Sequence, residues 1–121
     1  MEYKITNRQH LVIFNKVYDY IEDMIDLDEF TLIKGGLGGY EGLYELTNQD
    51  YETFFFIIMP EYWSNETEEG KKIISESPLL RIEKDYEREL NGLFGKIWIE
   101  PMKTFVKRNF GIEIKTIDLE D

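Results

Sequence analysis

The sequence contains no cysteine and no alanine, and it has a single histidine and three prolines among its 121 residues. The absence of cysteine excludes disulfide bonds, thiolate metal ligands and a thiol nucleophile. The longest apolar run, residues 54–60, is far shorter than a membrane span, and the first residues lack the basic and apolar regions of a secretory signal. We therefore expect a cytoplasmic protein that does not act at a membrane.

Basic side chains are scarce in the first half of the chain. Residues 1–69 carry 15 acidic and 4 basic residues, whereas residues 70–121 carry 10 of each, so the whole formal net charge of −11 lies in the first segment. A charge imbalance confined to one segment indicates a localised negative field that a positively charged partner recognises. This segment is therefore the first place to look for a binding surface.

The chain has the size and composition of one domain. It is 42% hydrophobic and 15% aromatic, which is enough large apolar side chains to bury a core in 121 residues. No internal repeat and no linker rich in Ser, Pro or Gly divides it. We expect a single domain over residues 1–121.

The first half predicts one helix followed by an antiparallel meander. Thr6 and Gln9 have the spacing of a capping box, and apolar residues then recur every three or four positions as far as Ile25. Strands are predicted over residues 30–34, 40–47 and 51–59, with a glycine-rich connection and a turn at 48–50 between them.

The second half predicts mainly helices. One is expected to begin in residues 64–69, where Asn65 and Glu68 have capping-box spacing, and a second is expected to run from Ser77-Pro78 to about Asn91-Gly92. A strand at residues 97–99, a helix over residues 100–109 and a closing strand at residues 112–117 complete the pattern. The expected fold is α+β, in which an N-terminal helix and C-terminal helices pack on an antiparallel sheet of three to four strands.

The densest acidic stretch places six carboxylates in eleven residues with no intervening base. Their mutual repulsion is unfavourable, and it falls near the end of a predicted helix, where the macrodipole also disfavours negative charge. A docking face for a basic protein explains this cost, with carboxylates taking the places of nucleic-acid phosphates. The residues predicted to contact a partner are Asp19, Glu22, Asp23, Asp26, Asp28 and Glu29, followed by Glu41 and Glu45.

Residues 35–39, Gly-Gly-Leu-Gly-Gly, lead from one predicted strand to another. Phosphate-binding loops lead instead from a strand into a helix, so we interpret this run as a flexible hairpin connection. If it closes over a partner, Leu37 is the expected apolar contact. Tyr62 and Trp63, at the end of the third predicted strand, are expected to be exposed and to add aromatic contacts.

No constellation of residues indicates catalysis. His10 has no identifiable nucleophile or orienting partner, and no pair stands out among the 25 acidic residues. Asp26 and Asp28 do not continue into a calcium loop, because Phe30 occupies the third ligand position. We expect no catalytic residues, no metal and no cofactor.

Direct nucleic-acid binding is also disfavoured. The basic patch of Lys103, Lys107 and Arg108 is small and belongs to an acidic protein that nucleic-acid phosphates repel.

The first hypothesis is a non-enzymatic inhibitor that binds and blocks a basic, nucleic-acid-acting protein, as a monomer or homodimer. In composition the chain is similar to bacterial immunity proteins and to phage-encoded inhibitors of host nucleases, although this similarity covers no motif. A second hypothesis is a small-molecule-binding or enzymatic α+β domain whose pocket is closed by the loop Gly35–Gly39. A third is an oligomerising scaffold that pairs the apolar strand at residues 54–59 with a second copy.

Overall fold

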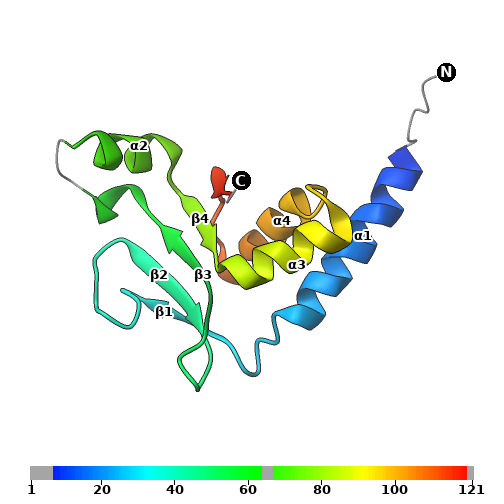
Figure 1. The fold of residues 1–121 in the computed structure, drawn as a ribbon, viewed down its shortest axis with the longest axis horizontal. Coiled ribbons are helices and arrows are strands. Elements are labelled where there is room, and N and C mark those ends of the chain that lie inside the picture. The colour runs from blue at the N-terminus through cyan, green and yellow to red at the C-terminus, as the bar shows by residue number, and fades with distance from the viewer. Residues whose placement is uncertain (1–6, 64–66, 120–121) are drawn as a thin grey trace.

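A five-stranded sheet forms the centre of the computed structural model, which describes residues 7–63 and 67–119 (Figure 1). The elements in chain order are α1 (Asn7–Met24), β1 (Thr31–Lys34), β2 (Leu43–Thr47), β3 (Thr53–Ile58), the short 3-10 helix η1 (Pro60–Tyr62), α2 (Glu68–Glu76), β4 (Leu79–Ile82), α3 (Lys84–Phe94), α4 (Ile99–Phe110) and β5 (Thr116–Asp118).

The strands lie in the sheet in the order of the chain, β1-β2-β3-β4-β5. The first three pairs are antiparallel, whereas β4 and β5 are parallel, because α3 and α4 carry the chain back before β5 begins. The expected α+β architecture is therefore confirmed, with one strand more than the upper expectation.

Each face of the sheet has its own apolar cluster. Leu46, Phe55 and Ile57 point to the face where α1, α3 and α4 pack, and they belong to the main core. Leu43 and Ile58 point to the opposite face, where the second cluster includes a residue of α2. Figure 1 shows the same division, with α1, α3 and α4 gathered together and α2 at the far end of the sheet.

Helix α1 uses only part of its predicted apolar stripe for packing. Tyr18, Ile21 and Ile25 are buried in the main core, whereas Leu11 near the start is exposed. The first turns of α1 project beyond α3 and α4 (Figure 1), so the apolar spacing continues where no described element covers it. The predicted cap, Thr6, lies outside the described residues.

The segment after Ser77 differs from the prediction. A helix was expected to begin at Pro78, but Leu79–Ile82 is strand β4 and pairs with β3, with Leu79 opposite Ile58. The apolar spacing of this segment fits a strand followed by a helix as well as one helix, and pairing with β3 decides between them. Helix α3 begins only at Lys84 and ends at Phe94 with Gly95 as its C-cap, somewhat later than the predicted end near Asn91-Gly92.

The last third of the chain matches the prediction only in part. The expected strand at residues 97–99 is absent from the described chain, where Trp98 is buried and α4 begins at Ile99. The predicted end of α4 is confirmed, because Gly111 adopts a left-handed conformation and donates its N–H to the Lys107 carbonyl at 2.9 Å. The closing strand is Thr116–Asp118, shorter and later than expected.

The start of α2 is capped by Thr67, whose hydroxyl accepts from the Gly70 N–H at 3.1 Å. The predicted capping residue Asn65 lies outside the described residues.

Candidate partner-binding surface

The acidic stretch continues from the end of α1 into a turn at residues 26–30, which is stabilised by hydrogen bonds. The Asp26 side chain accepts from the Asp28 N–H at 2.9 Å, and the Asp26 carbonyl accepts from the N–H groups of Glu29 and Phe30 at 3.0 and 2.8 Å. Phe30 is buried edge-on against Phe54, with 5.8 Å between ring centroids. Asp28 and Glu29 are therefore exposed carboxylates on a fixed turn directly before β1.

The glycine loop, residues 35–39, is anchored to the sheet rather than open. The Gly35 N–H donates to the Leu43 carbonyl at 2.6 Å, and the Tyr40 N–H donates to the Gly35 carbonyl at 2.6 Å. The Leu37 N–H donates to Glu45 Oε1 at 3.0 Å. The predicted hairpin connection is confirmed, since the loop joins the antiparallel strands β1 and β2.

Glu45 is the carboxylate that the loop covers. Its side chain also accepts from the Thr53 hydroxyl at 2.5 Å, and the residue is only 6% exposed. Gly36 lies directly over it with φ +66°, and a Cβ at this position would be 3.0 Å from Glu45 Oε1. Glu45 is therefore buried and hydrogen-bonded within the protein, and its contact with a partner stays a prediction.

A groove of about 400 Å³ lies between the turn that carries Asp28 and Glu29, the glycine loop and the β2–β3 turn. We call it the acidic groove, and its lining residues are Asp28, Glu29, Thr31, Ile33, Leu37, Thr47, Asn48, Gln49 and Tyr51. Among these nine described residues two are acidic and none is basic. Leu37 and Tyr51 are 50% and 74% exposed, so large apolar surface stands beside the two carboxylates. Such a groove suits the aliphatic stem and charged head of a Lys or Arg side chain.

Tyr51 was not among the predicted contact residues. The Asn48 side chain accepts from the N–H groups of Asp50 and Glu52 at 3.0 and 2.9 Å, and the chain then passes through Tyr51 with φ +62°. The predicted turn at residues 48–50 was the available signal, but the prediction assigned Tyr51 to the following strand. In this turn Tyr51 is exposed and lines the acidic groove.

A second depression, of about 490 Å³, lies at the other end of β1. We call it the tyrosine pocket, and its lining residues are Lys34, Gly35, Gly39, Tyr40, Glu41, Gly42, Tyr44 and Glu61. Tyr40 is exposed, and its ring lies 6.4 Å from the ring of Tyr62. The predicted contact residue Glu41 therefore belongs to a different depression from Asp28 and Glu29.

Tyr62 and Trp63 are less accessible than expected. Both are half-buried and pack against the second apolar cluster at Leu43 and Ile58. This corrects the expectation that the end of the third strand exposes them, because α2 and the short helix η1 fold back onto that face of the sheet.

The remaining predicted acids stay outside both depressions. Asp19, Glu22 and Asp23 are exposed on α1, and Asp26 is exposed but engaged in the turn. The structure thus brings Asp28, Glu29 and Leu37 into one groove and leaves the acids of α1 exposed outside it.

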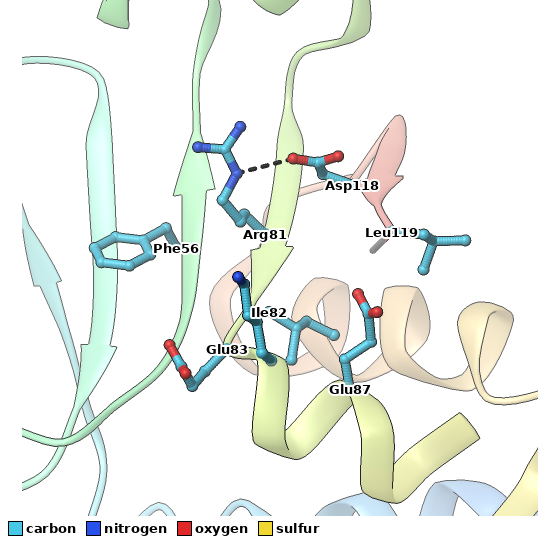
Figure 2. A pocket seen from close by; sticks show the side chains of 8 residues that line it. Phe56, Arg81, Ile82, Glu83, Glu87, Asp118 and Leu119 are labelled. Atoms are coloured by element: carbon cyan, nitrogen blue, oxygen red, sulfur yellow. Dashed lines mark hydrogen bonds and ion pairs between the residues drawn. The ribbon is translucent and has the colours of Figure 1, made fainter. Parts of the chain in front are cut away.

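A third depression, of about 330 Å³, lies at the opposite edge of the sheet (Figure 2). Its side chains come from β3, β4, β5 and the start of α3, and Figure 2 shows Arg81 Nε bound to Asp118 Oδ2 at 2.9 Å. The glycine loop lines the first two depressions and not this one. A small-molecule site here would therefore not be closed by that loop.

No group of three His, Asp or Glu side chains within residues 7–63 and 67–119 is placed to hold a metal ion. Likewise, none of the helices in these ranges is long and apolar enough to cross a membrane. No protein-family model, curated protein or solved structure matches this chain.

Proposed function

We propose that this chain is a non-enzymatic inhibitor that binds a basic, nucleic-acid-acting protein through the acidic groove and blocks it. One observation carries the proposal: Asp28 and Glu29 lie in the same groove as the exposed side chains of Leu37 and Tyr51. Interfaces gain most of their affinity from a few desolvated apolar or aromatic anchors, and charge complementarity adds specificity and a fast association rate.

The chemistry of the target follows from the sign of the charge. Proteins that act on nucleic acids bind phosphates with Lys and Arg, and carboxylates compete for the same side chains. The exposed acids Asp19, Glu22 and Asp23 extend the negative field along α1, so they attract such a surface before the groove engages it. Toxin immunity and phage counter-defence both require such an inhibitor, and the neighbouring genes distinguish them.

The test is affinity capture from the source cell with matched variants. The groove variant carries Asp28→Asn and Glu29→Gln, and the control carries Glu69→Gln and Glu89→Gln, two exposed acids on α2 and α3. Both variants lose two negative charges. We expect the groove variant to bind the captured protein at least about tenfold more weakly than wild type and the control to stay within about twofold. Wild type and the control should also inhibit the captured protein's activity on nucleic acid more strongly than the groove variant does.

Two results would contradict the proposal. Equal losses in both variants would show a general effect of net charge, and unchanged capture by the groove variant would place the contact elsewhere. Inhibition must also accompany binding, since a captured protein that keeps full activity is not a blocked target.

A second candidate function is small-molecule binding at the depression of Figure 2. Its volume falls within the usual range for ligand sites, and charged groups from several elements converge there. We rank it second because Arg81 and Asp118 already pair with each other. A thermal-shift screen of metabolite-sized compounds tests it, and a stabilising compound whose effect disappears in Arg81→Ala would favour it.

A further inference from the structure

Strand β1 is the edge of the sheet, and in the described part of the chain it pairs with β2 alone. Its outer side is open in Figure 1. The Gly35 N–H bonds to the Leu43 carbonyl, which identifies residues 35 and 43 as a hydrogen-bonded pair. Because such pairs alternate along an antiparallel ladder, Ile33 and Thr31 also bond to β2. The N–H and C=O groups of Leu32 and Lys34 consequently point outward.

The acidic groove and the tyrosine pocket meet this edge strand through Ile33 and Lys34, two neighbouring residues whose side chains point to opposite faces. Ile33 lines the acidic groove and is opposite Glu45, on the face that the glycine loop covers. Lys34 lines the tyrosine pocket and is opposite Tyr44, which packs against the main core on the other face. A strand placed beside β1 would therefore have one depression on each side of it.

Both depressions offer carboxylates to such a strand. Asp28 and Glu29 line the acidic groove, and Glu41 and Glu61 line the tyrosine pocket beside a single cation, Lys34. β1 itself is short and carries that lysine on its exposed edge, two features that discourage pairing with an arbitrary strand. A segment that supplies positive charge on both of its faces overcomes this barrier.

We propose that an extended basic segment of the partner protein adds to β1 as a sixth strand and inserts basic side chains into both depressions. This inference rests on the proposed function and specifies which element of the partner is recognised. Main-chain hydrogen bonds to Leu32 and Lys34 supply affinity, and the two depressions select alternate side chains. Because neighbouring side chains of a strand point to opposite faces, the two basic residues must be separated by an odd number of positions.

The probes are two nine-residue peptides of identical composition, each with two Lys residues in a background of seven Thr residues and blocked at both ends. In one peptide the lysines are three positions apart, and in the other they are two positions apart. We expect the odd-spaced peptide to bind at least about fivefold more tightly, as measured by fluorescence anisotropy at low salt. We also expect it to slow hydrogen exchange of the outward amides of Leu32 and Lys34.

Two substitutions at one position test the main-chain contact. Lys34→Pro removes the outward N–H, whereas Lys34→Thr removes the same charge and keeps the N–H. Proline is tolerated on an edge strand where the N–H faces solvent. We expect the peptide to bind Lys34→Pro at least about fivefold more weakly than Lys34→Thr. N-methylation of the peptide on the side that faces β1 should weaken binding equally, and this second test does not depend on how the protein variant folds.

The outcomes separate this inference from the proposed function. If binding depends on Asp28 and Glu29 but neither Lys34→Pro nor N-methylation weakens it, strand addition is wrong and the acidic groove stands. Equal affinity for the two peptides, or no binding of either, also overturns strand addition. Peptide binding that is unchanged by Asp28→Asn with Glu29→Gln would instead contradict the role of the groove in the proposed function.

Discussion

Glu45 joins the glycine loop to the sheet through both of its carboxylate oxygens. One oxygen accepts from the Leu37 N–H and the other from the Thr53 hydroxyl. A buried carboxylate with two donors fixes their positions, because either donor left without a partner would lose its hydrogen bond and its access to water. The exposed side chain of Leu37 is thereby held at the acidic groove.

We predict that Glu45→Ala lowers the free energy of unfolding by about 1–3 kcal/mol, since it leaves the Leu37 N–H and the Thr53 hydroxyl without their acceptor. Urea denaturation measures this loss. Hydrogen exchange at the Leu37 amide should become faster in the same variant, because the loop is released. Glu45→Gln is the matched control, since it keeps the volume and an acceptor oxygen. A Leu37 amide that exchanges equally slowly in Glu45→Ala would show that the loop does not need this contact.

At the level of secondary structure, α1 ends in a way that is unfavourable for the helix alone. Its last turn contains no basic residue and includes Asp23, although the C-terminal end of a helix carries a partial negative charge. Helix α2 shows the favourable arrangement, with Glu68 and Glu69 in its first turn. The acids at the end of α1 are consistent with a role in attraction of a partner rather than in helix stability.

We predict opposite effects from the same change of charge at these two helix ends. Asp23→Asn should raise the free energy of unfolding by about 0.3–1 kcal/mol, and Glu69→Gln should lower it by a similar amount. Urea denaturation at low ionic strength measures both. If both variants become more stable, relief of general negative repulsion outweighs the dipole. If neither changes, the end of α1 carries no electrostatic cost.

Local sequence patterns predicted the elements whose stability is mainly local. The start of the meander and the last helix were predicted from apolar spacing and turn residues. Strand β4 was missed because its apolar residues fit either period, and its true partner β3 lies some 20 residues earlier. The parallel pairing of β5 with β4 likewise depends on a crossover through α3 and α4 that no local pattern specifies.

The same distinction applies to the candidate site. Asp28, Glu29 and Leu37 were selected from charge and loop composition, and the fold places them in one groove. The covering of Glu45 by the glycine loop is a tertiary contact that the local sequence does not specify. Tyr51 was missed because its backbone conformation depends on hydrogen bonds to the Asn48 side chain.

Over the whole molecule, three basic residues of the second half already have partners within the protein. Lys103 pairs with Glu100 at 3.6 Å, Lys107 pairs with Glu113 at 3.3 Å, and the Arg108 guanidinium lies 4.9 Å from the centroid of the Tyr18 ring. The negative field of residues 1–69 is therefore not offset by a free basic patch at these three positions. Repulsion within that field lowers the stability of the free protein and speeds its encounter with a basic partner.

Salt should consequently change stability and association in opposite directions. Raising NaCl from about 0.01 M to about 0.5 M shortens the screening length from about 30 Å to less than 10 Å. We predict that the urea midpoint of the free protein rises over this range, because repulsion among its acids is screened. The association rate constant for the odd-spaced lysine peptide, measured by stopped-flow fluorescence, should fall at least about tenfold, and its dissociation rate constant should change much less.

The variant Asp19→Asn with Asp23→Asn, which leaves the groove intact, should show a smaller dependence on salt of both the urea midpoint and the association rate constant. A urea midpoint that falls with added NaCl would show that attractive ion pairs outweigh repulsion, and a salt-independent association rate would show that the acids of α1 do not steer the encounter.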